Sequence, residues 1–343
     1  MDFLLTKEQK YIQKAAKEFA RGEMAPMGRE FDLNETYPAD IVKKARGLDL
    51  IGLFIPEKFG GPGLGYLEQA MVMEEFWKID PGIGQQLCSL TFGAEEFLLF
   101  GTENQGKKFL EPIFTGDAVM GFAITEPDAG SDTLAAATTA VKEGNEWVLN
   151  GSKVMIGNGT RGTFMLIFAL TDPDAASRSK RHSIIIVETD RQGYKAEPMH
   201  GKMGLRCSDT AAIYLTNVRV PEENLIGTRG NGFHQLMAFF DRSRAYVSAH
   251  GVGLAQGALD MAVKHVRDRK QFGKPIGSFQ GVQFKIADMA VKIELARNIM
   301  YKAAWLLDQG MPDTNVTAMA KLYASRIAVE VVDEALQLHG GYG

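Results

Sequence analysis

The hydrophobic period of this 343-residue chain changes twice, and these two changes restrict its possible folds more than any other feature. Up to about residue 117, apolar side chains such as Ile12 and Ala16 recur at helical spacing. From Val119 the apolar runs become short, mostly β-branched, aromatic or aliphatic, and turn residues separate them. After Gly232 the helical period returns and persists almost to the last residue.

This order predicts an α+β multidomain protein with two all-α domains and a β-domain between them. The expected parts are an N-terminal helical domain (1–117), a middle antiparallel β-domain (118–230) and a C-terminal helical bundle (231–343). Thr6 and Gln9 match a capping box at the start of the first helix. Further helices are expected at 39–48, from Tyr66, and at 92–101, 104–114, 233–269, 280–308 and 315–338. Strands are expected at 138–141, 147–149, 154–156, 164–168, 183–187 and 211–215, with an exposed hairpin loop at 170–182.

Composition and charge exclude several classes of protein. The chain is 45% hydrophobic and 23% charged, which is typical of a soluble protein with a large core. A net charge of −4 argues against a nucleic-acid partner. The two cysteines, Cys88 and Cys207, have no metal-ligand spacing, so neither a metal site nor a disulfide framework is expected. No apolar run approaches the ~18 residues of a membrane span, and no leader precedes the first helical pattern, so we expect a cytoplasmic protein without membrane insertion. A processed organellar protein would show the same features.

One apparent nucleotide motif fails on its context. Gly157-Asn-Gly-Thr-Arg-Gly162 matches G-x-G-x-x-G, but a dinucleotide fingerprint must leave a strand and open a helix. The segment that follows, 163–170, has the pattern of another strand. A hairpin with Asn-Gly at its turn is therefore the preferred interpretation.

The segment Phe122-Ala-Ile-Thr-Glu-Pro-Asp-Ala-Gly-Ser-Asp132 is the first candidate for a binding site. Its apolar start favours a strand, and Pro127, Asp128 and Gly130 favour a turn with exposed N–H groups. Hydroxyl and amide donors beside apolar side chains would suit a flat heterocycle with polar edges. The residues alone fit an acidic hairpin turn equally well.

Five motifs in order resemble the acyl-CoA dehydrogenase family, and together they cover nearly the whole chain. The T-E-P-x-A-G-S-D stretch within 122–132 resembles that family's flavin and substrate signature. The other four motifs are Lys202-Met-Gly-Leu-Arg-Cys-Ser208, Asn217-Val-Arg-Val-Pro221, Asp268-Arg-Lys-Gln-Phe-Gly-Lys274 and His339-Gly-Gly-Tyr-Gly343. Any one of these would be weak evidence, but five in order are not.

The resemblance implies FAD as the cofactor and an acyl-CoA thioester as the substrate. Residues that it places at the flavin are Phe122, Ile124, Thr125, Gly130, Ser131, Met155 and Gly157. It places Arg269, Gln271 and Phe272 at the flavin diphosphate of a neighbouring subunit, and Gln280, Gln337, Gly340 and Gly341 at the adenosine half. A homo-oligomer, with a dimer of dimers as the expected form, follows from these shared sites.

Acyl-CoA would be bound, by the same resemblance, through an F-D-x-x-R stretch on the long helix. The substrate-binding residues that it implies are Thr91, Ser131, Phe233, Phe240, Asp241, Ser243 and Arg244. Asp241 and Arg244 could equally be a solvated i, i+3 ion pair, but the arginine fork suits a polar ligand and the binding role is favoured. The small Thr91 and Ser243 leave room for a short, branched or alicyclic acyl group.

Two departures from the family pattern concern the chemistry. Met155 stands where the family usually has a Trp, so a thioether replaces the ring that the resemblance places against the flavin. Gly157 stands where the family usually has Ser or Thr, so the hydroxyl donor expected near the flavin is missing. The family's general base is a carboxylate, and one of its two known locations holds Ser243 here. The other location follows the His339–Gly343 motif, so we expect the base on a C-terminal segment beyond Gly343 and name no catalytic residue.

The predicted function is FAD-dependent α,β-dehydrogenation of an acyl-CoA, with electrons passed to an electron-transfer flavoprotein. Alternatives within the fold are an acyl-CoA oxidase or a flavin monooxygenase, which the changes at Met155 and Gly157 keep open. A non-catalytic flavin- or CoA-binding relative that has lost its base is the alternative from another class.

Overall fold

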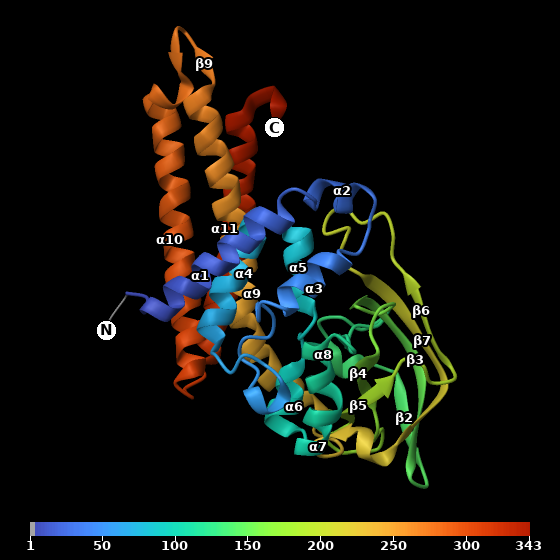
Figure 1. Ribbon diagram of the computed structural model, residues 1–343. Coiled ribbons are helices and arrows are strands. Elements are labelled where there is room, and N and C mark those ends of the chain that lie inside the picture. The colour runs from blue at the N-terminus through green and yellow to red at the C-terminus, as the bar shows by residue number, and fades with distance from the viewer. Residues whose placement is uncertain (1–3) are drawn as a thin grey trace. The chain divides into compact units, whose positions relative to one another are not determined.

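The computed structural model describes residues 4–343, which form two compact units (Figure 1). Unit 1 contains the chain up to Gly28, then Gly65–Gln85 and Asp241–Gly343. Unit 2 contains Arg29–Leu64 and Gln86–Phe240. Helical N-terminal and C-terminal segments flank a sheet in the sequence, as the change of period predicts.

Unit 1 is built from long helices. They are α1 (Lys7–Phe19), the π-helical turn η1 (Ala20–Met24), α4 (Tyr66–Ile79), most of α9 (Gly232–Asp268), α10 (Gln280–Asp308) and α11 (Thr314–His339). The predicted capping box is confirmed, since Thr6 Oγ1 accepts from Gln9 N at 3.1 Å and Thr6 N donates to Gln9 Oε1 at 3.0 Å. Asp308 receives two N–H groups at the start of α4, from Tyr66 at 2.7 Å and Leu67 at 3.0 Å. These bonds satisfy backbone donors that a helix leaves unpaired and fix α4 to the end of α10.

The predicted helices of this unit are confirmed, and close packing explains the glycines in α9. A Cβ atom at Gly253 would lie 2.4 Å from Glu74 O, and one at Gly257 would lie 2.3 Å from Lys78 O. Only glycine therefore allows α9 to approach α4 so closely. Helices α10 and α11 pack against each other, and Ala303, Leu307, Val316 and Ala320 pack together with Ala245 of α9.

Unit 2 contains a mostly antiparallel sheet in the order β6-β7-β3-β2-β4-β5-β8, with β1 parallel to β4. Its strands are β1 (Met120–Ala123), β2 (Thr139–Glu143), β3 (Glu146–Gly157), β4 (Phe164–Leu170), β5 (His182–Glu188), β6 (Tyr194–Pro198), β7 (Thr210–Pro221) and β8 (Leu225–Ile226). Its helical segments include α3 (Ala39–Arg46), α6 (Ala94–Phe100), α7 (Glu103–Gln105), the π-helical η3 (Gly106–Leu110) and α8 (Glu111–Thr115). Helices α2 (Gly28–Leu33) and α5 (Pro81–Ser89) each cross a boundary between the units in sequence.

Two local predictions were wrong. The strands expected at 147–149 and 154–156 are one strand, β3, which continues through Asn150-Gly151 with a shift of register against β7. The turn at 157–162 is not a hairpin, because β3 pairs with β2 and β7 whereas β4 pairs with β1, β2 and β5. The strand after that turn is confirmed as β4, so the rejection of a dinucleotide fingerprint stands. Helix α5 and strand β6 were missed.

The core of the sheet unit is apolar, with Trp147, Leu149, Ile167, Ile185 and Ile213 among its members. Within residues 4–343 no helix combines the length and the apolar composition that a membrane span needs. The hairpin predicted at 170–182 is confirmed, since Leu170 pairs with His182 at the start of the β4–β5 ladder.

Candidate functional site

The turn after β1 is confirmed by its hydrogen bonds. Glu126 N donates to Ala129 O at 2.9 Å and Ala129 N donates to Glu126 O at 3.3 Å, which closes a tight reversal around Pro127-Asp128. Ile124 and Thr125 are half-buried before the turn, while Gly130 and Ser131 are exposed after it. The reversal thus places two hydroxyls and an apolar side chain along one short stretch.

The end of β3 lies directly against this turn. Val154 N donates to Thr125 O at 2.9 Å, which joins the two segments. The next residue, Met155, has φ +60° and a side chain that is 65% exposed. A Cβ atom at Gly157 would have only Ser89 Cβ within 4.0 Å, so the position that lacks the family's hydroxyl is open. The structure therefore brings Thr125, Met155 and Gly157 into one neighbourhood.

A buried ion pair supports the turn, and the sequence interpretation missed it. Lys153 is 0% exposed and its Nζ lies 2.8 Å from Glu126 Oε1, whose side chain is 8% exposed. Burial lowers the pKa of Lys153 to about 8, against the opposing effect of the Glu126 charge. Burial alone would raise the pKa of Glu126, but Lys153 and two backbone amides lower it overall. Lys153 lies four and six residues after the buried Leu149 and Trp147 of β3, which indicates an inward-facing position, but no pattern in the sequence identifies Glu126 as its partner.

An aromatic cluster in unit 2 includes Phe92, the next residue in sequence after the predicted acyl-binding residue Thr91, which is buried. Phe92 meets Phe239 edge-on with ring centroids 4.9 Å apart, and Phe239 lies 5.3 Å from Phe122. Phe240 is half-buried beside Phe239, and Phe233 is half-buried at the start of α9. Of the predicted residues, Phe122 and Phe240 therefore belong to one aromatic cluster, whereas Phe233 packs on His234.

In unit 1, the ends of α9 and α11 lie together. The His265 and His339 rings stack with centroids 4.4 Å apart; Arg269 follows the first ring by four residues, and Gly340 and Gly341 follow the second directly. A two-stranded hairpin, β9 (Lys270–Gln271) with β10 (Lys274–Pro275), follows α9. At its tip Phe272 has φ +50° and is 93% exposed. Gln271, Gln280 and Gln337 are also exposed.

Asp241 and Arg244 form a weak contact at 3.4 Å. Asp241 also accepts from Thr314 Oγ1 at 2.9 Å, while Ser243 between the two charged residues is buried. The second oxygen of Asp241 is thus used by α11, so a ligand amide would have to share this carboxylate.

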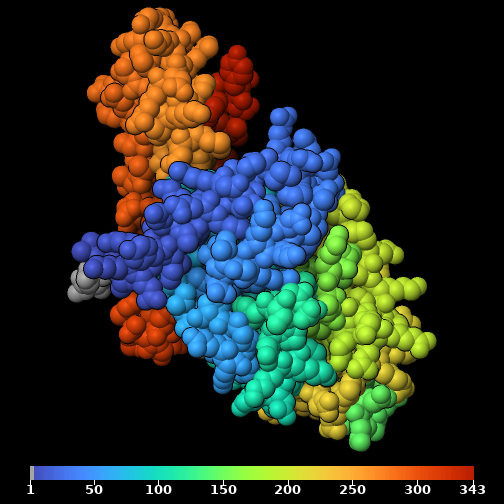
Figure 2. All heavy atoms as spheres, in the orientation of Figure 1, coloured from blue at the N-terminus to red at the C-terminus, as the bar shows by residue number. Residues whose placement is uncertain are grey.

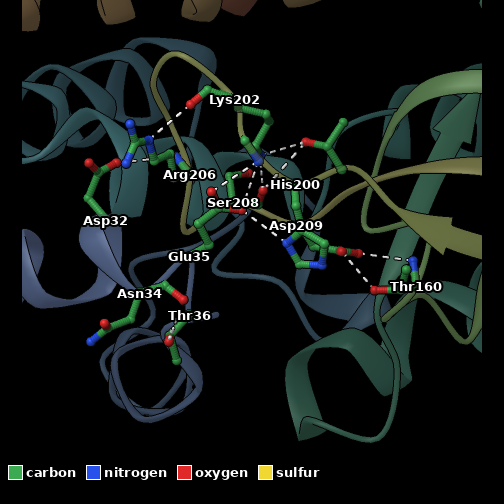
Figure 3. A network of polar contacts seen from close by, with 12 residues as sticks. Asp32, Asn34, Glu35, Thr36, Thr160, His200, Lys202, Arg206, Ser208 and Asp209 are labelled. Carbon is green, nitrogen blue, oxygen red and sulfur yellow. Dashed lines mark hydrogen bonds and ion pairs between the residues drawn. The ribbon is translucent and has the colours of Figure 1, made fainter.

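The Lys202–Ser208 motif forms a polar network of its own (Figure 3). Lys202 Nζ donates to Ser208 O and, at 3.1 Å, to Thr210 Oγ1. Asp209 accepts from Thr160 N at 3.0 Å, and Glu35 accepts from Gly201 N at 3.0 Å. These loops line a polar cavity of about 370 Å³. Because the acids of the cavity are paired with donors of the chain itself, the motif fixes the loops to one another.

Comparison with known proteins bears on all three parts of the chain. Family models described as the N-terminal, middle and C-terminal domains of acyl-CoA dehydrogenase match residues 6–117, 121–218 and 230–343. A probable acyl-CoA dehydrogenase of Bacillus subtilis, YngJ, is 40% identical over 100% of this chain and 90% of its own length. The chain belongs to the acyl-CoA dehydrogenase family.

Other relatives of this acyl-CoA dehydrogenase carry more specific names. An acryloyl-CoA reductase (NADH) of Anaerotignum propionicum is 41% identical over 100% of this chain and 87% of its own. Butyryl-CoA dehydrogenase from Megasphaera elsdenii has a TM-score of 0.95 at 36% identity, over 100% of this chain and 90% of that one. A chain from a solved structure described as "Electron transferring flavoprotein of Acidaminococcus fermentans: Towards a mechanism of flavin-based electron bifurcation" has a TM-score of 0.96 at 40% identity, with the same coverage.

This acyl-CoA dehydrogenase is a FAD-dependent oxidoreductase, and its β1 turn has donors that suit the flavin. Within residues 4–343 the hydroxyls of Thr125 and Ser131 make no hydrogen bond, and the Met155 side chain is largely uncovered. Free donors beside an exposed thioether and an open glycine match a flat ring with polar edges. No group of three His, Cys, Asp or Glu side chains in this described range is placed to hold a metal ion.

Proposed function

We propose that this enzyme dehydrogenates a short acyl-CoA at its α,β bond and passes the electrons to an electron-transfer flavoprotein. FAD would accept the hydride removed from the β carbon. The chain would bind and orient the thioester, with Phe122, Ile124, Thr125, Gly130, Ser131, Met155 and Gly157 facing the flavin ring. Thr91, Ser131, Phe233, Phe240, Asp241, Ser243 and Arg244 would contact the acyl-CoA.

The observation that carries the short chain is the aromatic cluster that contains the predicted site residues Phe122 and Phe240. Phe122 and Phe240 each pack against Phe239, and large rings held together in this way would leave room for only a short acyl chain. The name of the butyryl-CoA dehydrogenase relative supports the same acyl length. The similarity to a chain of the Acidaminococcus flavoprotein structure supports an electron-transfer flavoprotein as the acceptor.

The test is anaerobic titration of the FAD-loaded enzyme with saturated acyl-CoAs of four, eight and sixteen carbons. We expect the flavin absorbance to bleach with the four-carbon thioester at the lowest concentration. Bleaching only by the long thioesters would contradict the short-chain assignment. Reoxidation of the bleached enzyme by an electron-transfer flavoprotein, compared with oxygen, separates a dehydrogenase from an oxidase.

The acryloyl-CoA reductase relative supports a second candidate function, the reverse reaction with a 2-enoyl-CoA as substrate. Its discriminating assay is NADH consumption in the presence of acryloyl-CoA, the enzyme and an electron-transfer flavoprotein. A rate above that of saturated-substrate oxidation favours the reductase; no rate above the enzyme-free control favours the dehydrogenase.

We propose further that the enzyme is a homo-oligomer, a dimer of dimers, in which Arg269, Gln271 and Phe272 serve the flavin of a neighbouring subunit. Gln280, Gln337, Gly340 and Gly341 would contact its adenosine half. The exposed Phe272 and an apolar groove of about 450 Å³ beside it, lined by Val263, Val266, Pro275, Val282 and Ile286, support a contact surface here. This end of α9 and α10 is the orange surface in Figure 2. Large exposed apolar patches commonly mark protein interfaces.

Mixed chains test the shared site. An Arg269→Ala chain and a Thr125→Ala, Ser131→Ala chain, each poor in flavin, should regain flavin when they are unfolded and refolded together. In some mixed subunit pairs, one flavin site would combine the unmodified Arg269 of one chain with the unmodified Thr125 and Ser131 of the other. Flavin content equal to the mean of the two parents would exclude a shared site.

A further inference from the structure

The buried ammonium group of Lys153 donates a hydrogen bond through each of its three N–H bonds. Its Nζ donates to Ile124 O at 2.9 Å, to Glu126 Oε1 at 2.8 Å and to Phe168 O at 2.7 Å. An ammonium group carries three N–H bonds, so none is left over. The three acceptors belong to the end of β1, to the turn after it and to β4, so one buried side chain connects three segments of unit 2.

Glu126 completes the connection from the other side. Its carboxylate accepts from Ala137 N at 2.7 Å and Thr138 N at 2.9 Å, besides the bond from Lys153. Residues 124–126 and 137–138 are the two ends of the loop that contains Thr125, Gly130 and Ser131. Both ends of this loop are therefore held by the same ion pair.

Stability alone is a poor reason for such a pair. Removing two charges from water costs several kcal/mol for each ion, and apolar residues of the same volume often replace a buried pair without loss. What apolar residues cannot provide is directed hydrogen bonding to the carbonyl of Ile124 and the amides of Ala137 and Thr138. The charge-assisted bonds fix the position of the backbone that carries the Thr125 hydroxyl.

We propose that Lys153 and Glu126 are positioning residues, which act through the 124–138 loop to hold Thr125 and Ser131 at the flavin. The inference rests on the flavin contacts proposed for this loop. Both side chains are buried, so they would act on a bound flavin through the loop and not by direct contact. Loosening the pair should displace the loop and weaken the flavin site while the rest of the sheet remains paired.

The test compares Lys153→Met and Glu126→Gln with a matched variant, Asn224→Leu. Asn224 is 1% exposed in the same unit and donates to Ile186 O at 2.9 Å and Glu188 Oε2 at 3.0 Å, away from the loop. For each protein the melting temperature, the FAD dissociation rate and the flavin reduction potential are measured. The last two quantities would not move if the pair served stability alone.

We expect Lys153→Met to release FAD about tenfold to a hundredfold faster than the unmodified enzyme, as expected for the loss of charge-assisted bonds. Glu126→Gln should show a smaller change in the same direction, because its amide still meets one of the donors. Lys153→Arg should recover part of the flavin retention. Asn224→Leu should lower the melting temperature but leave the flavin rate within about twofold.

The proposal is overturned if Lys153→Met keeps the original FAD dissociation rate and potential, or if Asn224→Leu loses flavin to the same extent. Should Lys153→Met fail to fold, the milder Glu126→Gln and Lys153→Arg variants decide the question by the same readouts. The double variant Thr125→Ala, Ser131→Ala tests the proposed flavin contacts separately from the connection through the loop. If that variant keeps its flavin while Lys153→Met loses it, the proposed flavin contacts fail and the connection through the loop fails with them.

Discussion

Replacing Asn158 by alanine should destabilise unit 2 strongly. This side chain is fully buried, and Nδ2 donates to Ser89 O at 3.0 Å and Met120 O at 2.8 Å while Oδ1 accepts from Gln86 Nε2 at 2.8 Å. The loss of three buried hydrogen bonds costs about 3 kcal/mol, at about 1 kcal/mol each. The backbone at Asn158 has φ +60°, a conformation that costs an alanine a further ~1–2 kcal/mol but suits glycine.

The assay is thermal unfolding of Asn158→Ala and Asn158→Gly, followed by the fluorescence of the buried Trp147 in the same unit. A domain of this size loses roughly 2–4 °C per kcal/mol, so Asn158→Ala should melt ~10 °C or more below the unmodified protein. Asn158→Gly should lie between the two, because it loses the bonds without the backbone strain. If alanine is as stable as glycine here, or if both variants lie within about 1 kcal/mol of the original, the reasoning from these bonds is wrong.

Three further predictions use burial and packing. A Cβ atom in Gly121→Ala would lie 2.6 Å from Gly157 O and 2.7 Å from Met165 Sδ, so this variant should lose ~1–3 kcal/mol of its free energy of unfolding. The control Gly130→Ala has open space around the new methyl group and should melt at the temperature of the unmodified protein. Burial lowers the pKa of His250 to about 3, whereas in the unfolded chain this histidine binds its proton below about pH 6.5. The free energy of unfolding should therefore fall as the pH drops below about 6.5. The urea midpoint of His250→Phe should lack this dependence on pH. Burial, with the Glu95 charge, raises the pKa of Glu96 well above its usual value. The free energy of unfolding should therefore decline as the pH rises above about 4.3, where this glutamate ionises in the unfolded chain. Glu96→Gln should show a smaller decline in the same urea measurements.

The long helices could be read from the sequence because their ends are marked. Glycine and proline around 273–277 and 310–312 separate α9, α10 and α11, and the predicted bounds lie within one residue of those found. The strands were harder to predict. Asn150-Gly151 has the composition of a turn, yet Gly151 continues β3 with φ +148°, packed against Thr138. Local composition cannot show this, because strand pairing across the sheet overrides it.

The two missed elements have different causes. Strand β6 alternates half-buried Tyr194 and Ala196 with exposed Lys195 and Glu197, but it is only five residues long and ends at Pro198, so the pattern is too short to stand out in the sequence. Helix α5 contains Gly82 and Gly84, which lower helix propensity, and the packing of Gly84 against Trp77 explains one of them. In the candidate site, turn chemistry indicated the 122–132 segment, but the roles of Arg269 or Gln337 could come only from resemblance. The ion pair of Lys153 with Glu126 depends on a contact between residues 27 positions apart, which periodicity cannot reveal.

The interleaving of the two units has a consequence for how the chain acquires its structure during synthesis on the ribosome. Every residue of unit 2 precedes Asp241, so this unit can form its sheet as soon as Phe240 has left the exit tunnel. Unit 1 begins earlier in the sequence but cannot close until α10 and α11 have been made. Until then α4, against which α1 packs, has no α10 to cover it, and its apolar face is available to chaperones. A stalled nascent chain ending between α9 and α10 should therefore protect the sheet from protease while α1 remains susceptible.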